Sequence, residues 1–217
     1  MTTADSDQNA PNCELYVISP PRIDDLDAFA VLLDQMLATG AVACFQLRLK
    51  DVDDDSIRAA VRKIMPVCHA HEVAFILNDN ADLAHEMDAD GVHLGQGDGD
   101  VRAARTLLGH DKDIGVTCHD SRHLAFEAGD AGADYVAFGA FFDTSTKQTD
   151  ARPDLDILTV WDEVTDLPCV AIGGITVENC RSLADAGAHF VAVSAGVWNH
   201  PDGPVAAVNA FAKVLAT

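Results

Sequence analysis

The sequence predicts a single (βα)₈ barrel, the TIM-barrel class of α/β fold, and three observations support this. Short apolar segments recur along the 217-residue chain, and each is followed by a longer stretch with helical spacing or helix-friendly composition. The apolar segments are almost continuous, as expected of parallel strands that helices cover. No linker rich in Pro, Gly or Ser divides the series, which disfavours the competing architecture, a doubly wound open sheet.

The eight expected strands are short and strongly apolar. They cover residues 15–19, 44–49, 74–77, 91–94, 114–118, 135–139, 169–172 and 190–194. Residues 24–38 and 54–70 carry apolar side chains at near-helical spacing. Thr176 and Glu178 give a weak capping signal for a helix after the seventh strand. Residues 204–215 are typical of a terminal helix, with proline in its first turn.

Residues 1–13 are expected to form a disordered tail before a barrel domain that spans residues 14–217. The tail is polar, and it lacks the basic start and apolar stretch of a signal peptide. No apolar run in the chain approaches the roughly 20 residues needed to cross a bilayer. The six cysteines include no Cys-x-x-Cys pair. We therefore expect buried free thiols in a reducing cytoplasm rather than a structural zinc site.

Acidic residues dominate the charge of the chain, because 35 Asp and Glu face 14 Lys and Arg, giving a formal net charge of −21. This balance argues strongly against nonspecific nucleic-acid binding, which needs clustered cations. An anionic ligand would require the few cations to be concentrated at its site, or Mg²⁺ to intervene. Self-repulsion favours a soluble protein. The oligomeric state stays open, with a homo-oligomer among the alternatives.

Hydroxyl side chains and a cation follow the sixth expected strand at close spacing. They are Thr144, Ser145, Thr146 and Lys147. Hydroxyls donate hydrogen bonds to a phosphate, and an ammonium balances its charge, so this segment is a candidate phosphate site. The alternative is a surface turn that happens to hold these residue types.

Polar side chains also follow the second expected strand, where a barrel builds its site. The alternate spacing of Gln46, Arg48 and Lys50 turns all three to one face of an extended segment. Such groups are costly inside a barrel unless a ligand or a carboxylate meets them. Ligand binding is the favoured interpretation, and an internal ion pair with a nearby Asp is the alternative.

Two carboxylates at neighbouring strand ends are candidate metal ligands. Asp79, beside Asn78, follows the third strand, and Asp98 follows the fourth. Mg²⁺ takes one or two carboxylates and fills its other positions with water and phosphate oxygens. Each aspartate taken alone is more typical of a cap for the following helix. Together, beside a phosphate site, they favour the metal.

The remaining strand ends supply hydroxyls and glycines. Thr117 is a candidate anion donor after the fifth strand, whereas a structural role is the simpler explanation of His119. Gly174 follows the seventh strand, and Ser194 and Ala195 follow the eighth. Glycines let backbone amides approach a ligand, and a helix N-terminus favours an anion. Two anion sites and a metal predict two phosphorylated reactants, or one reactant and a diphosphate leaving group.

The ordered set of these segments resembles the thiamine phosphate synthase family over about residues 14–215. The segments that carry the resemblance are Gln-Leu-Arg-Leu-Lys (46–50), Asn-Asp (78–79), Val-His-Leu-Gly-Gln (92–96) with Asp98, Gly-Val-Thr (115–117), Thr-Ser-Thr-Lys (144–147), Ile-Gly-Gly-Ile (172–175) and Ser-Ala (194–195). The specificity lies in the order of the whole set.

The resemblance implies a transferase of thiamine biosynthesis. It would join 4-amino-2-methyl-5-(diphosphomethyl)pyrimidine to thiazole phosphate, or its carboxylate, through a pyrimidine cation, giving thiamine phosphate and diphosphate. By position, the residues that would bind the pyrimidine diphosphate are Gln46, Leu47, Arg48, Leu49, Lys50, Asn78, Thr117 and Lys147. Those that would bind the thiazole phosphate are Thr144, Ser145, Thr146, Gly174, Ser194 and Ala195. Arg48, Lys50, Thr117 and Lys147 would be catalytic, and Asp79 and Asp98 would hold Mg²⁺.

Several positions depart from the family pattern. Leu49 and Gly97 stand where acids are frequent, Thr117 and Ala195 where Ser is usual, and Ala140 and Asp143 where prolines are common. The last two predict a looser segment after the sixth strand. They also place a negative charge, that of Asp143, beside the candidate phosphate cluster.

Two other functions are weighed against this one. A thiazole tautomerase-like barrel would carry a catalytic His directly after the glycine of the sixth strand, where this chain has Ala140. A non-catalytic sensor of thiamine phosphates would have no need of a metal. The joint presence of Asp79, Asp98 and Lys147 therefore favours the enzyme over the sensor.

Overall fold

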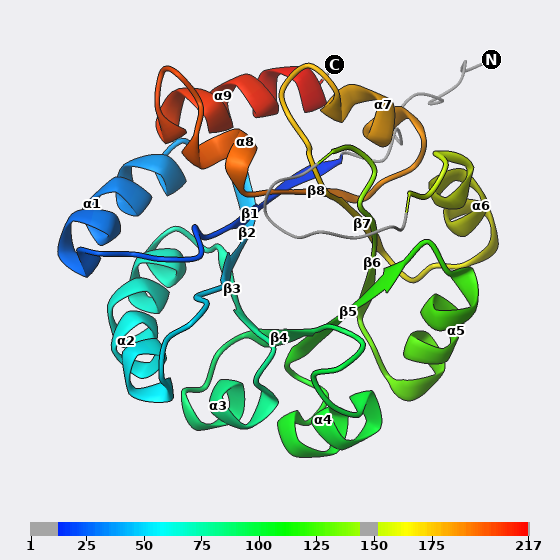
Figure 1. Ribbon diagram of the computed structural model, residues 1–217, viewed down its shortest axis with the longest axis horizontal. Helices are drawn as coiled ribbons and strands as arrows, with labels where there is room; N and C mark the ends of the chain where they lie inside the picture. Colours follow the sequence, from blue (N-terminus) through cyan, green and yellow to red (C-terminus); the bar gives the residue numbers. More distant parts are fainter. Residues whose placement is uncertain (1–12, 144–151, 217) are drawn as a thin grey trace, which may run out of the picture.

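Eight parallel strands close into a barrel in the computed structural model, which describes residues 13–143 and 152–216 (Figure 1). The strands are β1 (Glu14–Ile18), β2 (Val42–Leu47), β3 (Ala74–Asn78), β4 (Gly91–Leu94), β5 (Asp113–His119), β6 (Tyr135–Gly139), β7 (Cys169–Ile172) and β8 (Phe190–Val193). Each strand pairs with the next along the chain, and β8 pairs with β1 to complete the ring. All eight expected strands are present.

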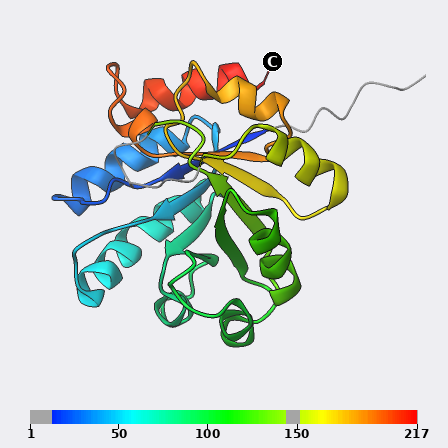
Figure 2. The same ribbon diagram turned by 45° about the vertical axis from the view of Figure 1, so that its right-hand side comes forward.

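Helices alternate with the strands and cover the outside of the barrel (Figures 1 and 2). They are α1 (Leu26–Leu37), α2 (Asp54–Ala70), α3 (Ala81–Glu86), α4 (Val101–Leu108), α5 (Arg122–Ala131), α6 (Asp156–Val164), α7 (Cys180–Asp185), α8 (Ala195–Trp198) and α9 (Pro204–Leu215). The last helix, α9, contacts α1 and α7, so it closes the outer layer. The predicted (βα)₈ class is confirmed.

Capping side chains explain where several helices begin. Asp25 accepts hydrogen bonds from the backbone N–H groups of Asp27 and Ala28 at the start of α1. The expected cap at Thr176 is wrong, because α7 begins only at Cys180. Asn179 precedes that helix, and its Oδ1 accepts instead from the backbone N–H of Thr176 at 2.8 Å.

The core has two parts, one between the sheet and the helices and one inside the barrel. The outer part is centred on large side chains such as Phe45, Phe75 and Trp161. The inner part is smaller and comprises Tyr16, Ile18, Cys44, Ile76, Ala137, Val170 and Ala192. All six cysteines are buried and unpaired, as predicted. They include Cys13, whereas the rest of the expected tail lies outside the described residues.

Parallel strands in a closed barrel end at one common edge, which we call the C-terminal rim: the segments that follow β1 to β8. Among the described residues, the polar segments identified in the sequence lie at the ends of strands or directly after them, and therefore at this rim. Within the described residues, no helix is both long and apolar enough to span a membrane.

We predict that Phe45→Ala lowers the free energy of unfolding by about 3–5 kcal/mol, since it leaves a cavity in the outer core. Phe45 is fully buried, and its ring lies 6.4 Å from that of Phe75 and 6.3 Å from that of Phe29. Denaturant unfolding measures the change. Val31→Ala is the control, because Val31 is 60% exposed. Equal effects of the two substitutions would contradict this description of the core.

Candidate active site

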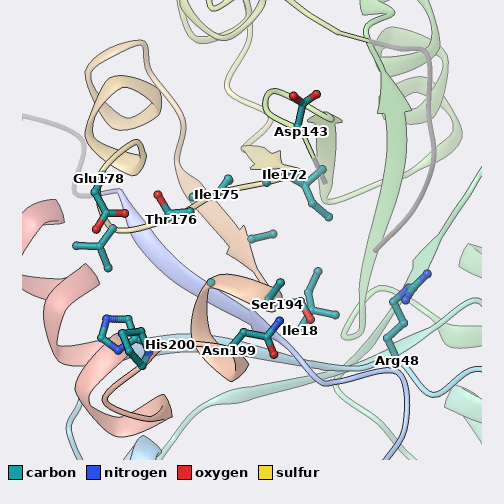
Figure 3. A pocket seen from close by; sticks show the side chains of 17 residues that line it. Ile18, Arg48, Asp143, Ile172, Ile175, Thr176, Glu178, Ser194, Asn199 and His200 are labelled. Carbon is teal, nitrogen blue, oxygen red and sulfur yellow. The ribbon is translucent and has the colours of Figure 1, made fainter. Parts of the chain in front are cut away.

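Two adjoining pockets open at the C-terminal rim. The central pocket, of about 310 Å³, lies over the barrel interior and is lined by Gln46, Arg48, Lys50, Asn78, Asp79, His93, Gly95, Asp98, Thr117, His119, Gly139, Ala140, Ile172 and Gly173. The outer pocket, of about 490 Å³, lies between the ends of β7 and β8 (Figure 3). Arg48, Ile172 and Gly173 line both, so the two pockets share a wall.

The segment after β2 alternates between the pocket and the helical layer. Gln46, Arg48 and Lys50 all line the central pocket, as their spacing predicts. Leu47 and Leu49 pack instead against the outer core, and Leu47 is 1% exposed. These two side chains face away from the central pocket, since successive residues of an extended chain point in opposite directions, and the role of Leu47 and Leu49 in substrate binding stays a prediction.

Lys50 forms an ion pair with Asp79, with 2.6 Å between Lys50 Nζ and Asp79 Oδ2. The ion pair with a nearby Asp, which the sequence left open as the alternative to ligand binding, is therefore present, and both of its residues line the central pocket. Asp79 directly follows β3 and has a left-handed backbone with φ of 70°, which is uncommon outside glycine. Its backbone N–H donates to His93 O at 2.8 Å, which fixes this conformation against β4.

Asp79 and Asp98 both line the central pocket, near enough for each carboxyl group to shift the pKa of the other. Neither caps a helix: Asn80 caps α3 by accepting from Leu83 N, and Asp100 caps α4 by accepting from Ala103 N. Asp98 Oδ2 accepts instead from Gly95 N at 2.8 Å. The capping alternative for both aspartates is therefore removed.

Their proximity separates the acidities of the two carboxyl groups. Partial burial, together with the hydrogen bond to Asp79 and its charge, raises the pKa of Asp98 above the ordinary value, although Gly95 N–H opposes this. Burial alone would raise the pKa of Asp79 as well. Hydrogen bonds with Lys50 and Asp98, and the charges of Lys50 and Arg48, nevertheless hold it below the ordinary value. Two neighbouring carboxyl groups with separated pKa values favour a positive charge between them, which a proton or a metal cation can supply.

The carboxylate pair fits a magnesium ion better than a transition metal. Two oxygen donors on neighbouring strand ends are what Mg²⁺ takes from a protein when phosphate and water supply the rest. No group of three or more His, Cys, Asp and Glu side chains with metal-binding geometry occurs among the described residues. A closed all-protein metal site is therefore not present in that part of the chain.

A chain of hydrogen bonds crosses the barrel interior beneath the central pocket. His93 Nε2 lies 2.8 Å from Thr117 Oγ1, and His93 Nδ1 lies 3.1 Å from Tyr135 Oη. The chain continues from Tyr135 Oη to Tyr16 Oη at 3.0 Å, and Gln46 Nε2 donates to Tyr16 Oη at 3.0 Å. The sequence analysis gave roles to Gln46 and Thr117 but none to His93, Tyr16 or Tyr135.

A sequence signal for these three residues exists. Tyr16, His93 and Tyr135 are the polar members of strands that are otherwise apolar, at positions that face the barrel interior. A polar group there requires a partner. His119, for which a structural role seemed simpler, also lines the central pocket, and its backbone is left-handed with φ of 54°.

The outer pocket is built on the turn after β7 and the start of α8. Gly173 and Gly174 both have positive φ, and a side chain at Gly174 would lie 2.3 Å from Asp143 O. Ser194 and Ala195 line the same pocket, and Figure 3 shows Ser194 near its centre, beside Ile18. Gly174, Ser194 and Ala195, which the sequence analysis selected together, are thus brought together.

The segment after β6 runs along this turn. Phe141 N–H donates to Ile172 O, and Phe142 N–H donates to Gly173 O. Asp143 lines the outer pocket, but its exposed carboxylate points away from the pocket centre (Figure 3) and pairs with Arg152 at 3.2 Å. Residues 140–143 are therefore tied down rather than loose. Thr144, Ser145, Thr146 and Lys147 lie outside the described residues.

Comparison with known proteins identifies a consistent set of relatives. A family model described as thiamine monophosphate synthase matches residues 15–197. The thiamine-phosphate synthase of Rhodospirillum centenum is 56% identical over 204 residues, covering 94% of this chain and 98% of its own. That of Erythrobacter litoralis is 50% identical over 207 residues, covering 94% and 95%. The solved thiamine phosphate pyrophosphorylase of Pyrococcus furiosus has a TM-score of 0.82 at 28% identity, covering 95% and 97%.

We predict that Asp79→Asn lowers the pKa of Asp98, because it removes the charge that raises it. Carboxyl-carbon NMR titration of the wild type and the variant measures the shift. Asp166→Asn is the matched control, since Asp166 is an exposed carboxylate just before β7, at the end of the barrel opposite the C-terminal rim, and it should leave the Asp98 titration unchanged. A wild-type Asp98 that titrates at or below the ordinary aspartate value would contradict the interaction.

Proposed function

The chain belongs to the thiamine monophosphate synthase family, and we propose that its central pocket takes the pyrimidine diphosphate while its outer pocket takes the thiazole phosphate. The enzyme joins the two substrates and releases thiamine phosphate and diphosphate. The observation that carries this assignment is the shared wall of the two pockets, at Arg48, Ile172 and Gly173. Two substrates seated on either side of that wall have their reacting ends side by side.

The reaction needs no covalent nucleophile from the protein. The bond between the pyrimidine methylene carbon and the diphosphate oxygen breaks, and diphosphate leaves with the electron pair. The lone pair of the thiazole nitrogen then forms the new carbon–nitrogen bond to the cationic methylene, which gives the thiazolium product. Positioning of the two reactants and stabilisation of the departing charge are the tasks left to the protein.

We assign the departing charge to the cationic side of the central pocket. Arg48 sits on the shared wall, and Lys50 sits beside the carboxylate pair. Burial lowers the pKa of Arg48, against the charge of Asp79, but a guanidinium stays protonated. In an otherwise acidic chain these two cations lie where the diphosphate would be released. Lys147 is proposed as a third, on the basis of its position in the family motif.

Asp79 and Asp98 are the residues that would hold Mg²⁺, since both carboxylates line the same pocket and interact electrostatically. The ion would neutralise negative charge on the diphosphate. Lys50 now pairs with Asp79, so a bound ion and the ammonium would lie on the same carboxylate. The fold brings the two carboxylates to one side of the pocket, despite their mutual repulsion.

The aminopyrimidine ring is assigned to the floor of the central pocket. Gln46, Asn78 and Thr117 supply uncharged polar groups there, from three different strands. In the outer pocket, Gly174, Ser194 and Ala195 are proposed to hold the thiazole phosphate, together with Thr144, Ser145 and Thr146. Glycines at the turn let backbone N–H groups approach an anion closely. The six buried free thiols favour the reducing cytoplasm as the location of the enzyme.

Neither alternative function gains support from the pockets. Ala140, where a tautomerase-like barrel would place its catalytic His, is 6% exposed and offers no proton-transfer group to the central pocket. A sensor would not require two neighbouring carboxylates beside Lys50. The carboxylate pair therefore remains the feature that favours turnover over binding alone.

We expect the purified protein, given both substrates and Mg²⁺, to yield thiamine phosphate and diphosphate in equal amounts, and chelation of the metal to abolish turnover. Asp98→Asn should reduce kcat by at least about 100-fold, because one donor to the ion is lost and the released charge is less well stabilised. Product analysis and a coupled diphosphate assay measure both. Asp166→Asn, at the opposite end of the barrel, is the matched control and should behave as wild type. Tight binding of both substrates without product would support the sensor instead.

A further inference from the structure

The hydrogen-bond chain beneath the central pocket connects two groups that face the substrate from opposite sides. It runs from Gln46 on β2 through Tyr16 on β1, Tyr135 on β6 and His93 on β4 to Thr117 on β5, with each successive pair of polar atoms 2.8–3.1 Å apart. Only its two ends are assigned to substrate binding. Of the three middle residues, Tyr16 and Tyr135 lie below in the barrel interior, whereas His93 also lines the central pocket.

Tyr135 is the centre of this chain, and the fold makes specific room for it. A side chain at Gly115 on β5 would lie 1.9 Å from the phenol ring, at Cζ, so the ring occupies the place of the absent Cβ. The ring stacks on His93, with 5.6 Å between ring centroids, and meets the edge of the Tyr16 ring at 6.1 Å. These contacts leave the Tyr135 hydroxyl in reach of both neighbours.

Hydrogen bonds in the barrel interior are stronger than hydrogen bonds at the protein surface, because the local dielectric constant is lower. When a buried polar group loses its hydrogen-bond partner, the folded state loses stability by the full desolvation free energy of that group. Among the described residues, no buried side-chain N or O atom lacks a hydrogen-bond partner. Burial raises the pKa of both Tyr16 and Tyr135, so both phenols keep their protons. The five side chains thus form a continuous hydrogen-bonded network in which both phenols are neutral.

We propose that Tyr135, acting with Tyr16 and His93, is a positioning residue of the synthase reaction. It fixes the Gln46 carboxamide and the Thr117 hydroxyl in the orientations that receive the aminopyrimidine ring. This inference rests on the proposed function, since it concerns the same pocket. None of the three residues needs to touch the substrate. Their role is to set two polar groups in advance, so that binding does not have to order them.

The test is Tyr135→Phe, which keeps the ring against Gly115 and removes only the hydroxyl. We expect kcat/KM for the pyrimidine diphosphate to fall about 10- to 100-fold, as for a binding group displaced within its pocket. The KM for thiazole phosphate should stay unchanged, because none of the five hydrogen-bonded side chains lines the outer pocket. Trp161→Phe is the control: it removes the buried hydrogen bond from Trp161 Nε1 to Leu167 O in the outer layer, and it should lower stability with unchanged kinetics.

A double substitution separates positioning from general destabilisation. If Tyr135 acts through His93 on Thr117, then Tyr135→Phe should cost much less in the Thr117→Val background than in wild type. Equal costs in the two backgrounds, or wild-type kinetics for Tyr135→Phe, would overturn the inference. If Tyr135→Phe does not fold, Tyr16→Phe carries the same test against Gln46→Leu. Absence of synthase activity in the wild type would instead refute the proposed function, and this inference with it.

Discussion

Closure of the parallel sheet is the constraint on which the site depends. Because every strand of the barrel ends at the same rim, segments that are far apart in the sequence meet there. The ion pair of Lys50 with Asp79 joins the ends of β2 and β3, and the interaction of Asp79 with Asp98 adds the loop after β4. A single slip of register in β2 would exchange Arg48 for a leucine and remove the shared wall of the two pockets.

The cations of the central pocket contrast with the strongly negative net charge of the protein. A chain with net charge −21 repels an anionic substrate at long range. Arg48 and Lys50 nevertheless lie together in the central pocket, where partial burial reduces screening. The same pocket holds two neighbouring carboxylates, which alone would be unfavourable. We propose that a divalent ion would bind between these two carboxylates, and the ion pair with Lys50 already offsets part of the charge of Asp79.

The fold was largely predictable from the sequence, because eight apolar runs in alternation with helical stretches leave few architectures. Period-two alternation also predicted that Gln46, Arg48 and Lys50 share a pocket. The same rule places the side chains of Leu47 and Leu49 on the face away from the pocket, although the family motif includes both residues. The prediction of a helix start near Thr176 was wrong, because local composition does not determine at which residue a helix begins. The roles of Tyr16, His93 and Tyr135 arise from contacts between five strands, and no local pattern reveals such partners.

The central claim is that the carboxylate pair and the two nearby cations receive a magnesium-bound diphosphate. Calorimetric titration of inorganic diphosphate into the wild type, with and without Mg²⁺, and into the Asp79→Asn, Asp98→Asn double variant tests it most directly. The account predicts at least about tenfold tighter binding with Mg²⁺ in the wild type, and no such gain in the double variant. Diphosphate that binds equally well without Mg²⁺, or gains equally in the double variant, would contradict it.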